Sequence, residues 1–345
     1  MSTTTIQFRR DTAANWISNN PTLAQGEVGL ETDTMAYKIG DGATSWTSLN
    51  YNNLAPSLTT MDLAGQSSDP SAPNTSNLVL YSKAIAGRMM TKQIGPSGLH
   101  TAFQPFLARN KIGYWAAPGN ATTVPGVFGY TAPTTTGTAT TRSVATTSLF
   151  TRMRRLAYVS SATAGSLCYQ YVAFAQVSVG DGSGNGGFFK ICRFGISDAA
   201  AVSGARMFCG VGSSIIAPTN VEPSTLTNSI GMGHGASDTT MHIYYGGSAA
   251  QTPIDLGSNF PSNTRSTDVY ELALYSPSNS NNIVYYEVTR INTGNVATGT
   301  LTGTAGTVVP ASTTLLSYQR IWRTNNATAL AVAYDVMSDY IETDN

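Results

Sequence analysis

The chain has 345 residues, enough for two or three folded units and for a core that needs no disulfide or metal to stabilise it. Its 19 basic residues equal its 19 acidic ones, and only 11% of residues are charged, against roughly 25% in an ordinary globular domain. This balance argues against a nucleic-acid-binding surface, which needs clustered lysine and arginine. The uncharged polar surface favours a rigid assembly over a typical enzyme surface.

Residues 1–54 are predicted to form a small module of short strands and tight turns. Alternating side chains indicate three strands, at residues 6–9, 26–31 and 37–39. Gly40-Asp41-Gly42 supplies the positive φ angles of a hairpin, and Thr12 to Ser18 favours one helical turn capped by Asp11. Neither the start of the chain nor any later stretch has the apolar run of a secretion signal or a membrane span. We therefore expect no membrane insertion.

Residues 55–118 are predicted to form a linker and shaft. The part up to Asn77 is rich in Ser, Pro, Asp and Thr and has no hydrophobic periodicity, as is typical of a linker. The sequence LVLYSKAIAGRMMTKQI that follows indicates two strands, separated at Ala86-Gly87. His100 to Arg109 favours a second short helix, which Pro105 limits to one or two turns.

Residues 119–345 are predicted to form a β-sandwich head domain. Short apolar runs rich in Val, Ile, Tyr, Phe and Thr alternate with clusters of Gly, Ser, Asn and Pro. These runs lie at residues 169–179, 188–196, 241–245, 269–275, 283–291, 315–322 and 329–337. None has the length and 3.6-residue period of a long helix, which argues against a parallel α/β fold. The expected fold is all-β, with an antiparallel, lectin-like sandwich or jelly roll.

The cysteines and the densest basic run indicate structural roles. Cys168, Cys192 and Cys209 form no CxxC or Cys/His pattern, and each lies in an apolar run, which indicates buried free thiols. The run from Arg152 to Arg155 is interpreted as solvated or carboxylate-paired arginines on a strand.

Two loop sequences could be mistaken for ligand sites. Gly180 to Gly184 lacks the residues of a phosphate or calcium loop and is interpreted as a hairpin tip. His234 and His242 flank Asp238, but the interruption between them makes a metal site a minor alternative. We expect no metal and no cofactor.

Glycan cleavage by paired carboxylates is the one catalytic chemistry that needs separate consideration. The head domain offers several candidates, and the sequence selects no pair among them: Asp181, Asp198, Glu222, Asp238, Asp255, Asp268, Glu271 and Glu287. The long regular repeat of a β-helix depolymerase is missing. We therefore expect no enzyme activity.

For receptor binding, aromatic side chains that could stack on sugar rings are Tyr244, Tyr245 and Trp322, with core packing as the competing interpretation.

The first segment carries a dense motif. Its positions include Arg9, Arg10, Asp11, Trp16, Gly26, Glu27, Lys38, Gly40, Asp41, Gly42 and Trp46. In order and spacing, this segment of about 50 residues resembles the amino-terminal region of phage tail-fibre and receptor-binding proteins, including the major tropism determinant of a Bordetella phage. The resemblance implies a trimeric β-prism element that attaches a fibre to the virion, and some relatives carry a hyaluronidase label. Independently, so short a module has a thin core that oligomerisation would stabilise.

Together these features predict a structural fibre protein of a bacteriophage particle. It would be a homotrimer, anchored to tail or capsid proteins by residues 1–54 and bound to a host cell-surface glycan or protein through the head domain. Its expected location is the virion, assembled in the host cytoplasm and released by lysis. One alternative is a capsid or tail decoration fibre without receptor recognition, and a weaker one is a glycan depolymerase.

Overall fold

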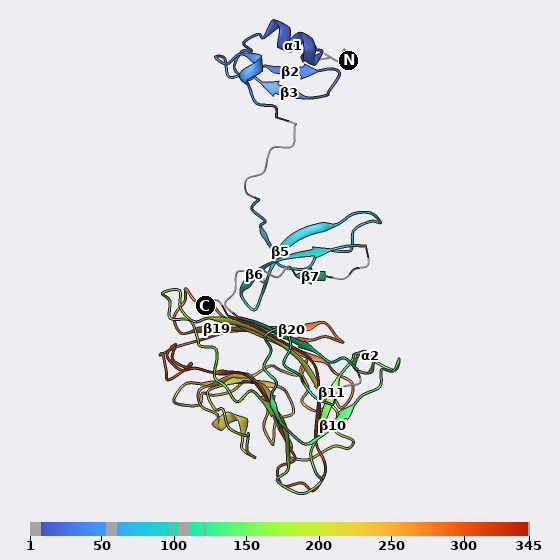
Figure 1. Ribbon diagram of the computed structural model, residues 1–345, viewed down its shortest axis with the longest axis vertical. Helices are drawn as coiled ribbons and strands as arrows, with labels where there is room; N and C mark the ends of the chain where they lie inside the picture. Colours follow the sequence, from blue (N-terminus) through green and yellow to red (C-terminus); the bar gives the residue numbers. More distant parts are fainter. Residues whose placement is uncertain are drawn as a thin grey trace. The chain divides into compact units, whose positions relative to one another are not determined.

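The computed structural model describes residues 8–52, 61–96, 98, 100–102, 111–119 and 122–343. The chain divides into two compact units, Met1–Leu63 and Ala64–Asn345 (Figure 1). The predicted boundaries at residues 54 and 118 remain predictions. The larger unit contains a four-stranded sheet and a β-sandwich.

The small unit combines one helix with a three-stranded sheet. Its elements are β1 (Arg9–Asp11), α1 (Ala13–Asn19), β2 (Val28–Glu31), β3 (Tyr37–Ile39) and the 3-10 turn η1 (Trp46–Ser48). β2 lies in the middle of the sheet, parallel to β1 and antiparallel to β3. The predicted cap of the helix is wrong by one residue, because Thr12, not Asp11, occupies the N-cap and accepts a hydrogen bond from Asn15 N. Asp11 instead accepts from Thr12 N and from the Asn15 side chain.

Two stacked tryptophans form the core of the small unit. The ring centres of Trp16 and Trp46 lie 4.1 Å apart, and both side chains are buried beside Leu23. Gly29 in β2 leaves room for them, because a Cβ there would lie 2.5 Å from the Trp46 ring. One face of the sheet is therefore covered by the tryptophans.

A four-stranded sheet follows in the larger unit. Its strands are β4 (Gly65–Gln66), β5 (Val79–Ile85), β6 (Arg88–Ile94) and β7 (His100–Ala102), in that order. The predicted break is confirmed at Ala86-Gly87, where both residues have positive φ angles. The predicted helix at 100–109 is wrong where the structure describes it, since residues 100–102 pair with β6 as a strand. Residues 103–110 lie outside the described residues.

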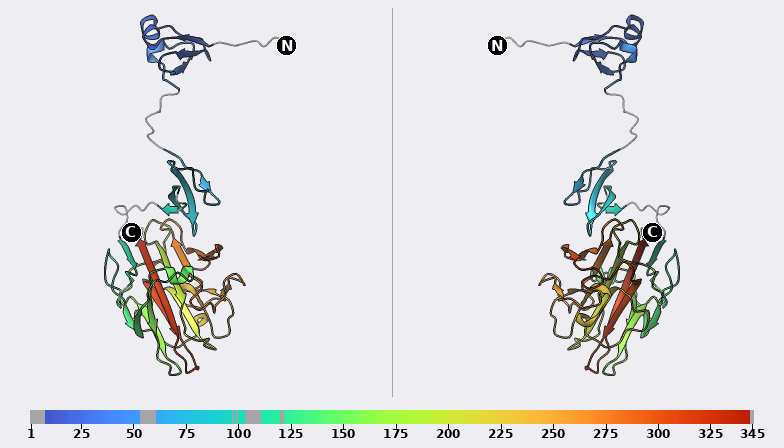
Figure 2. Two further views of the ribbon diagram at one scale, coloured as in Figure 1. Left: turned by 90° about the vertical axis from the view of Figure 1, so that its right-hand side faces the viewer. Right: turned by 90° about the vertical axis from the view of Figure 1, so that its left-hand side faces the viewer.

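Two antiparallel sheets pack face to face as the predicted sandwich, seen as two layers in Figures 1 and 2. The larger sheet contains β8 (Lys111–Ala116), β10 (Thr138–Thr141), β11 (Leu156–Val159), β13 (Phe188–Ile196), β18 (Tyr270–Ser276), β19 (Ile283–Arg290), β20 (Asn295–Thr302) and β22 (Ala333–Thr343). The smaller sheet contains β9 (Thr134–Thr136), β12 (Leu167–Tyr171), β14 (Arg206–Gly212), β15 (Ser229–His234), β16 (His242–Gly246), β17 (Ile254–Asp255) and β21 (Ser317–Thr324). Short helical segments occur at α2 (Leu149–Arg152) and η3 (Pro223–Thr225).

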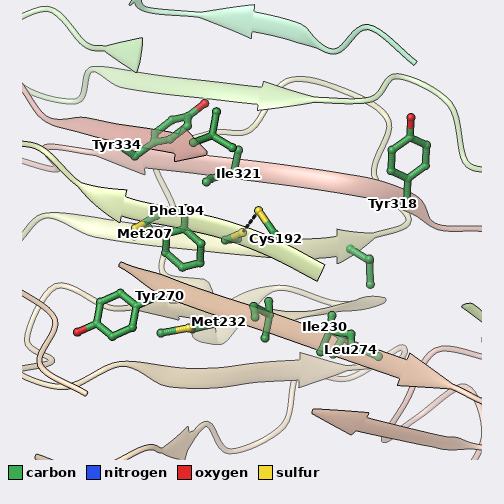
Figure 3. Close-up of a cluster of buried hydrophobic side chains, with 14 of the residues drawn as sticks. Cys192, Phe194, Met207, Ile230, Met232, Tyr270, Leu274, Tyr318, Ile321 and Tyr334 are labelled. Atoms are coloured by element: carbon green, nitrogen blue, oxygen red, sulfur yellow. Dashed lines mark hydrogen bonds between the residues drawn. The ribbon is translucent and has the colours of Figure 1, made fainter. Parts of the chain in front are cut away.

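The main core lies between the two sheets. Figure 3 shows part of it, where Cys192 and Phe194 of β13 meet Met207 of β14. All three cysteines are free and buried, as predicted. The alternation of apolar residues along each strand thus produced one continuous core.

The strand register places the connections at two opposite ends of the sandwich. Ile196 of β13 pairs with Tyr334 of β22, whereas Phe188 pairs with Thr343. The connections at the Ile196 end, which we call the loop end, include residues 160–166, 197–205, 235–241, 256–269 and 325–332. β8 begins beside Thr343, at the opposite end.

The β5–β6 hairpin packs against the larger sheet, away from the loop end. Arg88 forms a buried ion pair with Glu342, and its guanidinium lies 4.9 Å from the ring centre of Phe189. Ala86 and Met90 pack in the same small apolar cluster as Phe189. The hairpin is therefore an integral part of the larger unit.

A fully buried ion pair joins two central strands. Lys190 Nζ of β13 lies 2.5 Å from Asp339 Oδ1 of β22, and the Tyr130 hydroxyl donates to Asp339 Oδ2 at 2.7 Å. Burial alone lowers the pKa of Lys190, but attraction to Asp339 outweighs it and raises that pKa above its ordinary value. The lysine is therefore charged, and each ion neutralises the other within the core.

Replacing Lys190 with Met should lower the free energy of unfolding by about 3–5 kcal/mol, because the Asp339 charge would stay buried without its partner. The measurement is urea denaturation followed by tryptophan fluorescence. The triple change Lys190→Met, Asp339→Leu and Tyr130→Phe is the control, since it removes every polar group of the cluster and should recover most of the loss. A single variant as stable as the native chain would contradict the assigned role.

Candidate functional site

The structure places two of the three predicted receptor-binding residues together. Tyr244 and Trp322 are 2% and 1% exposed and form one cluster with Phe208 on the outer face of the smaller sheet. Tyr245 points to the other side and packs against the main core. None of the three presents an exposed ring face, because the strands bury Tyr244 and Trp322 and the alternation along β16 turns Tyr245 inward.

The turn residues of the amino-terminal motif stabilise the small unit. Asp41 Oδ1 accepts hydrogen bonds from the backbone N–H groups of Ala43 and Thr44, and hydrogen bonds from Thr44 and Ala43 lower the pKa of Asp41 to about 2. Glu27 Oε2 accepts from Ala24 N at 2.8 Å. A Cβ at position 40 would lie 2.3 Å from Ala24 O, so the close approach requires Gly40.

The cations of the motif pack on its aromatic rings. Lys38 Nζ lies 4.9 Å and 4.1 Å from the ring centres of Trp46 and Tyr51, and donates to Trp46 O at 2.7 Å. The Arg9 guanidinium lies 5.3 Å from the ring centre of Trp16. The motif residues therefore specify the fold of the small unit.

The face of the three-stranded sheet opposite the tryptophans, which we call the uncovered face, is apolar. Gly29 and Lys38 face the tryptophans, so the residues beside them in β2 and β3 point the other way. The uncovered face comprises Arg10, Val28, Leu30, Tyr37 and Ile39, and Phe8 directly precedes β1. Phe8 is 58% exposed and Ile39 is 43% exposed.

Four neighbouring pockets, which we call the pocket row, lie at the loop end of the sandwich. The acidic pocket has a volume of 370 Å³ and is lined by Glu222, Asp238 and His242, and the histidine pocket has a volume of 250 Å³ and is lined by His234 and Arg323. The arginine pocket has a volume of 510 Å³ and is lined by Arg142 and Arg265. The serine pocket has a volume of 500 Å³ and is lined by Ser160, Ser161 and Ser166. The acidic and histidine pockets share Ser237 and Asp238, and the arginine and serine pockets share Val159.

A buried ion pair connects the two halves of the row. Arg323 lines the histidine pocket, and its partner Asp198 lines the arginine pocket. The guanidinium donates to Asp198 through Nε and a terminal nitrogen, and Ala333 N donates to the same carboxylate at 2.6 Å. Asp198 is thereby neutralised beneath both pockets.

Two carboxylates face each other in the acidic pocket. A Cβ on Gly235 would lie 2.7 Å from Glu222 Oε2 and 3.0 Å from Asp238 Oδ2. Glu222 is paired with Arg206 at 2.7 Å. Burial raises the pKa of Asp238, but hydrogen bonds from the Tyr244 hydroxyl and Gly235 N outweigh it and lower that pKa. Asp238 is therefore an ionised acceptor.

His234 is a structural residue of the histidine pocket. Arg323 can only donate, so His234 Nε2, which lies 2.7 Å from it, must be an acceptor, and Nδ1 carries the proton that is donated to Gly235 O. Burial, and then the charge of Arg323, lower the pKa of His234 to about 3. The metal site considered for His234, His242 and Asp238 is not formed, and no group of three or more potential ligands occurs among the described residues.

The sequence contained a weak signal for the pocket row. Most of its polar residues lie in the connections between predicted strands, as in the GHGASDTT segment around Asp238. Sequence reasoning missed Arg142 and Arg265, because nothing local distinguishes them from surface arginines. In the part of the chain that the structure describes, no helix is long and apolar enough to cross a bilayer.

The neutral His234 makes stability depend on pH. In the unfolded chain the His234 imidazole takes up a proton below about pH 6.5, whereas in the folded chain its pKa is about 3. The contribution of the neutral imidazole to stability is therefore lost as the pH falls from 6.5 towards 3. Between pH 7 and pH 5, the native chain should lose about 2 kcal/mol more unfolding free energy than His234→Gln. Denaturation at both pH values measures this, with His242→Gln as control. Equal losses for His234→Gln and the native chain would contradict the assignment.

Comparison with known proteins confirms the resemblance of the first segment. Residues 6–44 match the family described as the major tropism determinant N-terminal domain. A protein of Streptococcus pyogenes phage H4489A, named hyaluronoglucosaminidase, is 41% identical over 46 residues. That match spans 13% of this chain and 12% of the phage protein.

Solved structures similar to this chain include lectin II from Ulex europaeus, with a TM-score of 0.43, 14% identity and coverage of 68% of this chain and 99% of the lectin. Another is the CBM2 module of the evolved Dit of Lactobacillus casei BL23 phage J-1, with a TM-score of 0.33, 13% identity and coverage of 54% and 75%. The chain thus combines an antiparallel β-sandwich with a phage-related first segment, which is similar to the major tropism determinant N-terminal domain over residues 6–44.

Proposed function

We propose that this protein is a structural component of a phage particle that attaches to a host-surface polysaccharide through the pocket row. The small unit would hold the chain on the virion, which the match to the major tropism determinant N-terminal domain supports. The sandwich would carry the binding surface.

The position of the pocket row carries this proposal. Within the larger unit, β8 begins beside Thr343, and Arg88 of the hairpin binds Glu342 at the same end of β22. The pockets lie at the other end of β22, next to Ala333, and the long red strand of Figure 2 can be followed between the two ends. Eleven residues of strand separate the ends by roughly 35 Å. A chain held at one end would therefore present the pockets outward.

The shape and lining of the pocket row suit a polysaccharide. Neighbouring pockets can accept successive sugar units, so weak contacts would add along one chain and between several copies on a particle. The serine pocket offers hydroxyl groups, whereas the arginine and acidic pockets offer charges of opposite sign.

We propose that binding is not followed by cleavage. A glycosidase needs one carboxyl group with a raised pKa to act as an acid. In the acidic pocket Asp238 has a lowered pKa, and Glu222 is held by Arg206. A glycan depolymerase remains the second candidate, because these two carboxylates face the same space and a relative is named hyaluronoglucosaminidase.

We further propose that the chain is a homotrimer joined through the uncovered face. A sheet of three short strands with one apolar face exposed is marginal by itself, and three copies could bury these faces along a shared axis. Val28, Leu30 and Ile39 would supply the apolar contacts, while Arg10 would lie at the margin.

Light scattering of the native chain should give a mass near three times 36.3 kDa. The change Ile39→Glu should yield monomers, because three carboxylates would meet at the apolar axis. The matched control is Ile17→Glu, which alters an apolar residue on α1 that is more exposed (57%, against 43% for Ile39) and should leave the trimer intact. A trimeric Ile39→Glu chain would contradict this interface.

The change Ser237→Trp should abolish sedimentation of the purified protein with host cells, because it fills the region shared by the acidic and histidine pockets. The control is Ser183→Trp, at an exposed residue before β13 and away from the loop end.

Three results would contradict the proposed function. If the native protein ignores every host strain, a decoration fibre is favoured. If Ser237→Trp binds like the native chain, the pocket row is not the binding surface. Shortening of the host polysaccharide during incubation would favour the depolymerase.

A further inference from the structure

The arginine pocket contains more positive charge than its carboxylates neutralise. Arg142 and Arg265 line it, together with Ser197 and Ser266. The carboxylate at its base, Asp198, is fully engaged by Arg323 and a backbone N–H group.

Arg142 shares its nearest carboxylate with a better-placed arginine. Arg155 Nε donates to Asp335 Oδ2 at 2.8 Å, and the Ser197 hydroxyl donates to Asp335 Oδ1. Arg142 Nε lies 3.7 Å from Oδ1, beyond hydrogen-bond distance, and this buried atom has no hydrogen-bond partner within the described part of the chain. Within the described residues, the terminal nitrogens of Arg142 form one hydrogen bond, to Ser197 Oγ, which is long at 3.4 Å.

Arg265 is the second cation at the pocket. It donates to Ala199 O at 3.1 Å, and it forms no ion pair with any residue that the structure describes. Four arginines (Arg142, Arg155, Arg265, Arg323) thus surround two aspartates (Asp198, Asp335), although the chain as a whole has zero net charge.

This arrangement is unfavourable unless an anion binds. Two surplus guanidinium groups at one pocket repel each other, and a buried donor without a hydrogen-bond partner is destabilising. The planar fork of arginine matches the paired oxygens of carboxylate and phosphate groups. The pocket volume of 510 Å³ also exceeds what a single small ion would fill.

We propose that the arginine pocket binds an anionic sugar unit, through a carboxylate or phosphate group held between Arg142 and Arg265. This inference rests on the proposed function, since it names the chemical class of the polysaccharide that the pocket row would bind. The serine and histidine pockets on either side would accept the adjoining sugars.

The test is calorimetric titration of the full chain with three probes. Tetragalacturonate supplies carboxylates, poly(glycerol phosphate) supplies phosphates, and cellotetraose is a neutral saccharide of matched length. At low ionic strength one anionic probe should bind tighter than cellotetraose, and added salt should weaken that binding. Which anionic probe binds distinguishes carboxylate from phosphate.

Substitutions then locate the site. Arg142→Gln and Arg265→Gln should each weaken binding of the anionic probe about tenfold or more, because each removes a charged hydrogen-bond donor. Arg142→Lys keeps the charge but loses the fork, so it should lie between Arg142→Gln and the native chain. The control is Arg154→Gln, an exposed arginine that lines none of the four pockets and should bind normally. Thermal melting checks that each variant is folded.

The inference is overturned if neither anionic probe binds, if cellotetraose binds as tightly as both, or if the two Gln variants bind like the native chain. Host-cell sedimentation separates this failure from that of the proposed function. Arginine variants that still bind cells, beside a Ser237→Trp variant that does not, would leave the pocket row as the binding surface and refute the anionic unit. A native chain that binds the anionic probe but no cells would support the site and refute the attachment function.

Discussion

The strand β22 determines how the larger unit is assembled. It pairs with β8, β11 and β13, and it carries three fully buried carboxylates along its length. Asp335 binds Arg155 near the loop end, Asp339 binds Lys190 in the core, and Glu342 binds Arg88 of the hairpin. Each of these ions would be costly to bury alone, so each partner is fixed in position by a charge on one strand. The pockets and the hairpin are held at opposite ends for this reason.

The small unit is limited by its size, since its few residues can bury only a small apolar core. Stacked tryptophans, a lysine packed between rings and glycines at the closest approaches make one face compact. Among the residues of this unit that the structure describes, the buried apolar cluster of Trp16, Leu23 and Trp46 lies on that face alone. A motif dense enough to recognise in the sequence is therefore also one in which nearly every position has a packing or turn role.

Much of the fold could be predicted because strands and turns depend on local patterns. The break at Ala86-Gly87 and the sandwich strands follow from alternation and turn residues. The cap at Thr12 was missed because two neighbouring residues can both accept hydrogen bonds there. The grouping of residues in the arginine pocket could not be predicted, since strand pairing between distant segments brings Arg142, Asp198 and Arg265 together. Tyr244 and Trp322 were found to be neighbours only once the strand order was known.

The central position of β22 also has a consequence for synthesis. β8 is synthesised more than two hundred residues before β22, the strand with which it pairs. β13 also pairs with β22 and is synthesised before it. Until residues 333–343 leave the ribosome, the larger sheet has an open gap, and its strands present unpaired edges to other nascent chains. Long-range pairing of this kind is slow, because a large loop must close before any contact compensates for it. Folding of the head should therefore be late, cooperative and sensitive to chaperones that shield strand edges.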